Sequence, residues 1–457
     1  MDITRVLRGL AWFVLGAASL AVLLYLALLA INWSDEPPSG DVATLRTLLE
    51  SPPVVDADNG YVYALGLVVA ADQDPLAQGA KRRAYLESLT ATDRDHDGLS
   101  IPGERNHYVA ERPAVVSLLE SACKRGGADC AVLLERSTDT LDVWMRSEGW
   151  LLERYRQLIQ RARWREVVPS NISGPLPAYQ HLMHGQELYL LEAWRAGRAG
   201  DARVVRDHLQ RDLRFWREVL RSSSLLITKV IAAAAVDRNF AYGSLALRAL
   251  PAELQHEAIP ASWREPIARE ERAMFRALAG EHRWSDAAIL RGEGLVVTES
   301  LTDGALADHL MRPLFQPQAT SNLYAASLLE MARAFDVAEL TQMPDVLERR
   351  RDTGGSGLRV LLHPYNPVGH VSIEIAKPSY IDYLPRAADL EGARRAALLA
   401  ATLRTQGVTP ADAAAAIRAS PLTDPYTGAP LRWDAEHTSV VFTGLARGER
   451  QRRSVPL

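Results

Sequence analysis

The sequence predicts a mainly α-helical protein: an N-terminal transmembrane helix, a helical body built like an array of helix pairs, and a small α+β part at the C-terminus. Three observations predict this class. Residues 10–31 contain no charged side chain, long stretches of the middle repeat apolar residues at helical spacing, and short β-favouring runs enter after residue 353.

The uncharged run has the length of a membrane anchor. About 20 apolar residues cross the hydrocarbon core of a bilayer as a helix, and residues 10–31 read LAWFVLGAASLAVLLYLALLAI. Arg5 and Arg8 precede the run and an Asp-Glu pair follows it, so the positive-inside rule puts the N-terminus in the cytoplasm and the body outside. We expect residues 1–33 to form a cytoplasmic tip and an anchor that contacts the lipid bilayer through residues 10–31.

A cleavable signal peptide is the alternative. Its apolar region would span about 7–15 residues and end in a small-x-small site, whereas this run is longer and ends in Ala27-Leu28-Leu29-Ala30.

Arginine outnumbers lysine and alanine is abundant, which is typical of a GC-rich bacterial genome. We therefore expect a single-pass protein of a bacterial inner membrane with its body in the periplasm.

The bulk composition is that of a folded protein. Hydrophobic residues make up 47% of the 457-residue chain and charged residues 24%, which allows a sizeable core. The net charge of −4 argues against a nucleic-acid partner, because proteins that bind nucleic acid usually carry a basic domain or stripe.

Four parts are expected beyond the anchor. They are a polar linker (34–40), a first helical unit with a disulfide and an acidic loop (41–170), a helical array (171–352) and a small α+β region (353–457). Helices in the first unit are expected near residues 41–50, 76–90, 111–123 and 140–164.

The array contains a helix–turn–helix pattern, QELYLLEAWRAGRAGDARVVRDHLQRDLRFWREVL. Gly197 and Gly200 fall at the expected turn, and Asp201 is a suitable N-cap for the second helix. Residues 225–236 are apolar but short and contain Lys229, which predicts a buried core helix. A further helix pair is expected over 318–351.

The C-terminal region mixes both kinds of element. LRVLL (358–362) and HVSIEIA (370–376) favour β-structure, and residues 389–406 are strongly helical. Residues 424–433 and 439–445 are two runs separated by polar residues, which predicts a β-hairpin.

Several segments resemble a group of bacterial single-pass inner-membrane proteins with no known activity. They are NGYVYALGLVVAADQDPLAQG near the front, then NPVGHVSIEIAKPSYIDYL, DLEGARRAALLAATLR and DPYTGAPLRWD in the tail. The last contains a DPxTGxPLxW element, Asp424–Trp433, that is similar to a C-terminal signature of envelope proteins. Pro425 and Gly428 are turn residues, so we expect this element to hold the fold together.

The chain has two cysteines, Cys123 and Cys130, with two glycines between them. An oxidising compartment favours disulfide formation, so we expect these two residues to form a structural disulfide. A metal pair or a redox pair is the alternative, although both usually use C-x2-C spacing and no second pair is present.

An acidic segment, DRDHDGLSIPGE (93–104), matches the calcium-loop pattern D-x-[DN]-x-[DN]-G-x5-E. The candidate calcium ligands are Asp93, Asp95, Asp97 and Glu104. Carboxylates at alternate positions can surround one ion, and a glycine permits the sharp turn. The usual apolar position holds a serine, and a Pro-Gly pair would interrupt an exiting helix, so a solvated acidic turn remains the alternative.

Other catalytic or metal signals are weak. His181 and His184 lie at i, i+3 spacing, but a third ligand at motif spacing is missing, and ordinary core or surface histidines are the alternative. The sequence contains no G-x-S-x-G nucleophile elbow and no phosphate loop. It therefore favours a non-enzymatic role without deciding the question.

Three functions fit these observations. The first is a membrane-tethered periplasmic protein that binds another protein or an envelope component through its helical body. The second is a periplasmic hydrolase whose residues converge only in three dimensions. The third is an immunity or inhibitor protein.

Overall fold

The computed structural model describes residues 3–90, 114–115, 117–118, 128–171, 174, 176–292, 309–352, 363–448 and 451–457. Within this part the chain is mainly helical and ends in a small three-stranded sheet. The predicted fold class, with an apolar helix at the N-terminus, is therefore confirmed.

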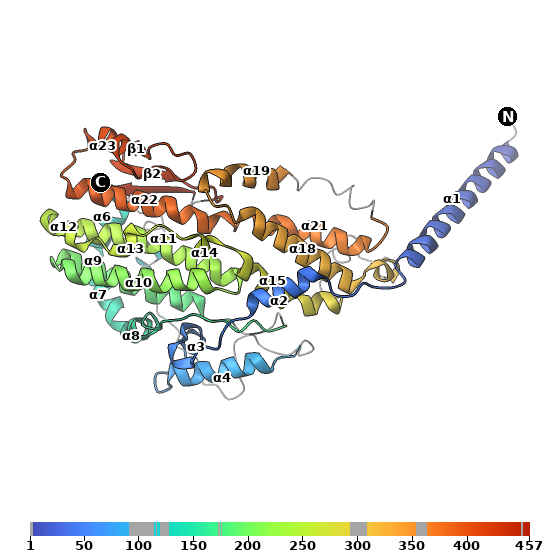
Figure 1. The fold of residues 1–457 in the computed structure, drawn as a ribbon, viewed down its shortest axis with the longest axis horizontal. Coiled ribbons are helices and arrows are strands. Elements are labelled where there is room, and N and C mark those ends of the chain that lie inside the picture. Colours follow the sequence, from blue (N-terminus) through green and yellow to red (C-terminus); the bar gives the residue numbers. More distant parts are fainter. Residues whose placement is uncertain are drawn as a thin grey trace.

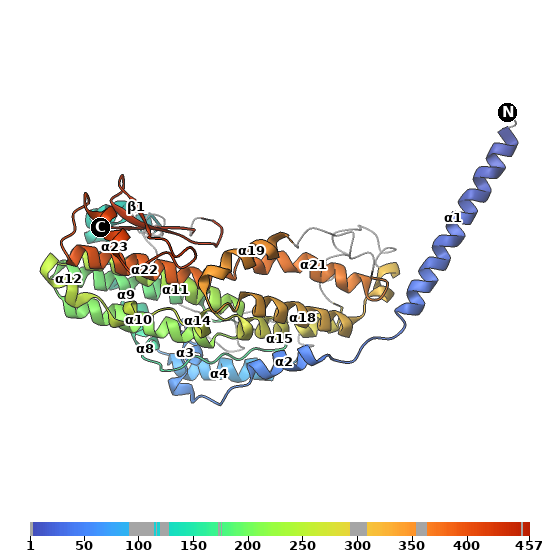
Figure 2. The ribbon, with the colours of Figure 1, turned by 45° about the horizontal axis from the view of Figure 1, so that its top comes forward.

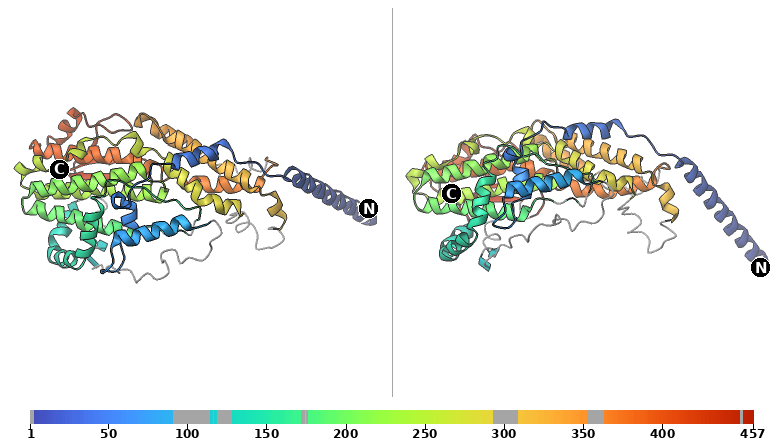
Figure 3. Two further views of the ribbon diagram at one scale, coloured as in Figure 1. Left: turned by 60° about the horizontal axis from the view of Figure 1, so that its bottom comes forward. Right: turned by 90° about the horizontal axis from the view of Figure 1, so that it is seen from below.

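The elements of the first half precede or form the central bundle. They are α1 (Ile3–Ile31), α2 (Gly40–Leu49), η1 (Asp56–Asp58), α3 (Gly60–Leu65), α4 (Pro75–Ser88), α6 (Ala128–Arg136), α7 (Thr138–Ser147), α8 (Gly149–Leu158), α9 (Tyr179–Arg198), α10 (Ala202–Ser222) and α11 (Leu226–Ala249). Helices α3 and α4 pack together on one side of the body (Figure 3).

The elements of the second half complete the bundle and form the sheet. They are α12 (Ala252–Ala258), α13 (Ala261–Arg264), α14 (Arg269–Arg272), α15 (Phe275–Leu290), η2 (Arg312–Leu314), α18 (Pro317–Phe335), η3 (Leu340–Gln342), α19 (Met343–Asp352), α21 (Pro367–Ile381), α22 (Pro385–Thr405), α23 (Ala413–Ala419), β1 (Arg432–Asp434), β2 (Ser439–Thr443) and β3 (Arg452–Pro456). Helices α18 and α19 form the pair that was expected over 318–351.

Helix α1 projects from one end of the elongated body (Figures 1 and 2). Its segment Leu7–Ile31 is long and apolar enough to cross a membrane, and none of its most apolar window is buried in the protein. The other end of the body carries the chain's C-terminus (Figure 1).

Three consecutive long helices, α9, α10 and α11, form the centre of the body, and α22 lies beside α11 (Figure 1). Short connections make consecutive helices antiparallel. At the first connection Gly200 adopts a φ of +78°, and Asp201 caps α10 by accepting a hydrogen bond from the Val204 N–H. The predicted helix–turn–helix and its N-cap are confirmed.

A buried polar network holds the bundle helices in register. The carboxylate of Asp212 in α10 accepts hydrogen bonds from the Tyr155 hydroxyl (2.5 Å), Gln186 Nε2 (3.0 Å) and Asn239 Nδ2 (2.9 Å). Burial raises the pKa of Asp212 to about 6. Because these partners come from α8, α9 and α11, one carboxylate ties four helices together.

Two large apolar cores run through the body. The first lies among α8, α9, α10, α11 and part of α22, and the second lies among α15, α18, α22 and the sheet. Helix α22 contributes to both cores. The unit boundaries expected at 170 and 352 remain predictions, and the larger core contains residues from both sides of them.

The C-terminal sheet has the order β1–β2–β3 with antiparallel pairing throughout. The predicted hairpin is thus confirmed as the β1–β2 pair. The sheet packs on α22 at Gly392, where a Cβ atom would lie 2.1 Å from Cζ of Phe442. Only a glycine at this position leaves room for the phenylalanine ring.

Two sequence predictions of local structure were wrong. Residues 370–376 belong to helix α21 and not to a strand, because Asn366 caps the helix and Pro367 fixes its first turn. The helix expected over 140–164 is two helices, α7 and α8, which meet at Glu148 and end at Leu158. The β-favouring run at 358–362 lies outside the described residues. Of the helix expected near 111–123, only residues 114, 115, 117 and 118 are described.

Candidate functional site

The last turn of α1 is fastened to the body by Asn32. The Asn32 amide nitrogen donates hydrogen bonds to the carbonyls of Leu28 and Pro364, both at 2.8 Å. Its Oδ1 accepts from the N–H of Asn366 at 2.7 Å, and Gln316 donates to its main-chain oxygen at 2.5 Å. Asn32 therefore joins the end of α1 to the segments that lead into α18 and α21.

The segment after α1 is also fixed. Both carboxylate oxygens of Asp35 accept from N–H groups at the start of α18, those of Gln318 (2.7 Å) and Ala319 (2.9 Å). Glu36 accepts from Nδ2 of Asn322 at 3.1 Å. A carboxylate here satisfies N–H groups that the helix leaves free and matches its dipole. The polar linker of the sequence prediction thus lies against α18.

Apolar contacts complete this junction. The residues of α1 and of the body that pack together are Tyr25, Leu28, Leu29, Leu314, Phe315 and Val368. The Tyr25 hydroxyl also donates to the Leu310 carbonyl at 2.9 Å. Because these contacts begin at Tyr25, residues 7–24 stay free of the body and span ~27 Å at ~1.5 Å per residue, close to the ~30 Å hydrocarbon core.

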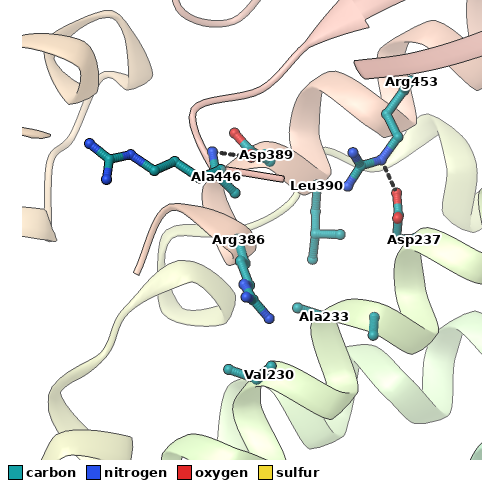
Figure 4. A pocket seen from close by; sticks show the side chains of 10 residues that line it. Val230, Ala233, Asp237, Arg386, Asp389, Leu390, Ala446 and Arg453 are labelled. Carbon is teal, nitrogen blue, oxygen red and sulfur yellow. Dashed lines mark hydrogen bonds and ion pairs between the residues drawn. The ribbon is translucent and has the colours of Figure 1, made fainter. Parts of the chain in front are cut away.

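A cavity of about 270 Å³ opens between α11, the first turns of α22 and the segment that follows β2 (Figure 4). Its apolar lining comes from Val230, Ala233 and Ala234 of α11 and from Leu390 of α22. Three arginines and two aspartates also line it, namely Arg386, Arg447, Arg453, Asp237 and Asp389. We call this cavity the arginine pocket.

Both carboxylates of the arginine pocket are already engaged. Oδ1 of Asp237 lies 2.7 Å from Nε of Arg453. Asp389 accepts from the Tyr426 hydroxyl at 2.6 Å and from the N–H groups of Leu445 (2.8 Å) and Ala446 (3.0 Å). Burial raises the pKa of Asp389, and these hydrogen bonds oppose the rise.

The guanidinium groups are less fully engaged. Arg386 lies over the ring of Tyr383 at 4.5 Å and has no carboxylate partner among the described residues. The Arg447 side chain is 67% exposed, and its Nε lies 3.9 Å from Asp382. Nη1 of Arg453 is buried and has no hydrogen-bond partner in the described part of the chain. The pocket can therefore accept negative charge.

A second cavity of about 350 Å³ lies between α2 and α15 and is lined by Arg46, His282 and Asp286 among others. Burial lowers the pKa of His282, and the carboxylate of Asp286 opposes this shift. Nε2 of His282 lies 3.2 Å from the Ser321 hydroxyl, but that hydroxyl donates to Asp286 at 2.5 Å and its residue is fully buried. The group resembles a hydrolase triad in composition, but the hydroxyl donates to the carboxylate and not to the imidazole that would activate it.

The sequence-predicted site residues fall mostly outside this geometry. The calcium candidates Asp93, Asp95, Asp97 and Glu104 lie outside the described residues, and calcium binding there stays a prediction. Cys130 is buried in α6 and Cys123 lies outside the described residues, so their disulfide also stays a prediction.

The histidine pair lies on α9. The rings of His181 and His184 have centroids 6.2 Å apart on α9. In the part of the chain that the structure describes, no group of three or more His, Cys, Asp or Glu side chains is arranged to hold a metal ion.

Sequence reasoning missed every charged residue of the arginine pocket. One signal was present: the DLEGARRAALLAATLR and DPYTGAPLRWD segments, which carry the resemblance, meet through the hydrogen bond between Tyr426 and Asp389. No protein-family model, curated protein or solved structure matches the chain. The resemblance to single-pass inner-membrane proteins therefore stays an expectation.

Proposed function

We propose that this chain is a membrane-tethered periplasmic protein that binds another protein or an envelope component through its helical body. The observation that carries the proposal is the junction at Asn32 and Asp35, which joins a fully exposed apolar helix to a folded body. An apolar helix of this length is stable in water only when something covers it, and a bilayer does so.

The orientation follows from the charges in the first turns of α1. Arg5 and Arg8 precede the apolar run, so the N-terminus lies in the cytoplasm and the body in the periplasm. The proposed Cys123–Cys130 disulfide fits that compartment. The fixed junction gives the elongated body one orientation relative to the bilayer. A fixed orientation suits a protein that presents a binding surface to a partner.

The arginine pocket is the binding site that we favour. It combines an apolar lining with guanidinium groups that lack full partners, and pockets of this composition bind and orient ligands. A hydrolytic role has less support, because the Ser321 hydroxyl is buried and donates a hydrogen bond to Asp286. An inhibitor or immunity protein would use the same tether and differs only in its partner.

A position-specific crosslinking experiment tests this function. A photoreactive amino acid replaces Arg447 at the pocket rim or, as the control, Arg203, whose side chain is 84% exposed on α10. In intact cells the full-length chain should form a discrete adduct from position 447 and none from 203. Equal labelling from both positions, or none from either, would contradict a binding role for the pocket.

A further inference from the structure

We propose that the arginine pocket binds a small organic anion, a carboxylate or phosphate group carried on a short apolar part. This inference rests on the proposed binding function and names the chemical class of the ligand. It comes from three features of the pocket: an excess of guanidinium groups, a buried donor without an acceptor, and an apolar wall beside the guanidinium groups.

The balance of charge in the pocket leaves room for an anion. Three arginines and two aspartates line the pocket: Asp237 pairs with Arg453, and Asp389 is held by Tyr426, so Arg386 and Arg447 have no aspartate partner within the pocket. The carboxylate oxygens of Asp389 accept hydrogen bonds from the Tyr426 hydroxyl and from two main-chain N–H groups. Arg386 therefore keeps a guanidinium group available for a ligand, and arginine binds carboxylate and phosphate in a bidentate manner.

A buried donor points to the same chemistry. Arg453 pairs with Asp237 through Nε, which leaves Nη1 buried and without an acceptor. A buried polar group without a partner costs free energy, and an anionic oxygen in the pocket would supply the missing acceptor. Figure 4 shows Arg386 and Arg453 on either side of Leu390, so a ligand over that residue can reach both.

The apolar lining of the pocket disfavours small inorganic anions, which would have to lose their hydration shell there. Val230, Ala233 and Leu390 give the pocket an apolar wall, which favours a ligand with an apolar part over inorganic phosphate. The volume of about 270 Å³ accommodates a short apolar part together with its anionic group. The pocket is lined by α11, the start of α22 and the segment after β2, and Figure 1 shows α11 and α22 apart from α1, which favours an anionic group of the proposed partner over a lipid headgroup of the same bilayer.

The rim of the pocket is fixed before a ligand arrives. Gly444 lies so close to Asp389 that a Cβ atom would approach Oδ2 to 2.4 Å. Asp389 in turn holds the N–H groups of Leu445 and Ala446. A site that needs no rearrangement binds without the cost of ordering its walls.

The test uses the full chain in lipid nanodiscs and measures binding by calorimetry. The probes are butyrate, butyl phosphate, inorganic phosphate and, as the matched cation, butylamine. Butyrate or butyl phosphate should bind, butylamine should not, and inorganic phosphate should bind at least tenfold more weakly than the better butyl anion. The two butyl anions distinguish a carboxylate ligand from a phosphate ligand.

Two variants locate the binding. Arg386→Gln should weaken binding of the better butyl anion at least tenfold, because it removes a guanidinium group that has no carboxylate partner. Arg432→Gln makes the same charge change at an exposed position of β1 and should leave binding unchanged.

Three outcomes would overturn the inference: no heat with either butyl anion, equal binding of butylamine, or equal effects of the two variants. If the anions fail while position 447 still forms its adduct, the ligand class is wrong and the binding function stands. If the adduct also fails, both are wrong.

Discussion

The main-chain N–H of Asn366 donates a hydrogen bond to Oδ1 of Asn32 across 2.7 Å, joining residues 334 positions apart in the chain. Asn366 adopts a left-handed φ of 50° and is fully buried. Asparagine tolerates this conformation better than most residues. The contact joins the start of α21 to the residue that follows α1.

Removing this contact should release α1 from the body. In Asn32→Ala the buried N–H of Asn366 loses its acceptor, at a cost of ~1–3 kcal/mol. We expect segment 34–39 to become sensitive to protease in nanodiscs while the bundle stays intact. Gel analysis of the cleavage products measures the effect.

The adjacent residue gives the control for that experiment. Trp33 is 89% exposed, so Trp33→Ala should leave the segment as resistant as in the unmodified chain. If Asn32→Ala is cleaved no faster than Trp33→Ala, the junction is not what holds the body to the anchor.

The stability of the body should depend on pH through Glu166. This buried carboxylate caps α11 by accepting from the N–H groups of Ser224 and Leu225 and from the Thr228 hydroxyl. Burial raises the pKa of Glu166 from 4.5 to about 7, and the hydrogen bonds oppose that rise. The folded state therefore binds more protons than the unfolded state between pH 4.5 and 7, and stability falls as pH rises through this window.

Two other buried groups shape the same profile. Asp212, with a pKa raised by burial from 3.8 to about 6, adds to the fall. Burial lowers the pKa of Lys229 from 10.5 to about 7, so the unfolded state binds the extra proton above pH 7 and stability rises again towards pH 10.5. We therefore expect a minimum of stability near pH 7.

Glu166→Gln should reduce the fall in folding stability between pH 4.5 and 7. The glutamine cannot ionise, so the loss of stability from pH 5 to 7 should shrink, by up to ~2–3 kcal/mol at ~1.4 kcal/mol per pKa unit. Melting temperatures at pH 5, 7 and 9 measure the effect, with Glu253→Gln at an exposed position of α12 as the control. An unchanged slope in Glu166→Gln would contradict the assignment.

Tyr426 should be needed for the stability of the C-terminal region. Tyr426→Phe removes the hydroxyl that donates to the buried Asp389 at 2.6 Å, which should cost ~1–3 kcal/mol. Tyr383→Phe is the matched control, because the side chain of Tyr383 is 39% exposed. Urea unfolding should show a lower midpoint for Tyr426→Phe than for Tyr383→Phe. Equal midpoints would contradict the expectation that the DPxTGxPLxW element, Asp424–Trp433, holds the fold together.

Calcium binding to the acidic segment remains a prediction from its sequence. Millimolar calcium should raise the melting temperature by mass action, since extracytoplasmic loops of this type bind at about 10⁻⁴–10⁻³ M. Asp93→Ala should abolish the increase and leave the calcium-free protein nearly unchanged. A solvated acidic turn, in contrast, would give neither a thermal shift nor a calorimetric heat with the unmodified chain.

The parts of the fold that could be predicted are those encoded locally. The uncharged run fixes α1, the Gly200–Asp201 pair ends one helix and starts the next, and the 424–445 pattern sets the hairpin. Residues 370–376 were misjudged because β-branched residues favour strands locally, whereas Asn366 and Pro367 start a helix that packs in the body. Such tertiary contacts carry no local signal.

The arginine pocket could not be predicted for the same reason. Its charged residues come from α11, α22 and the segments around β3, and Asp237 and Arg453 are 216 positions apart. A single arginine among many gives no sign of its role until the fold brings it to a cavity. The linker was recognised by its polar residues, but its contact with α18 depends on Asp35 meeting a helix start that lies 283 positions away.

We propose that α1 anchors the chain with its body in the periplasm, and a pair of reporter fusions tests this topology. Alkaline phosphatase folds to an active enzyme only outside the cytoplasm, and a cytoplasmic reporter such as β-galactosidase is active only inside it. Fused after Leu457 of the full chain, the phosphatase should be active and the galactosidase silent, with both fusions in the membrane fraction after a carbonate wash. The reverse pattern of activities, or release of the chain by the wash, would contradict the account.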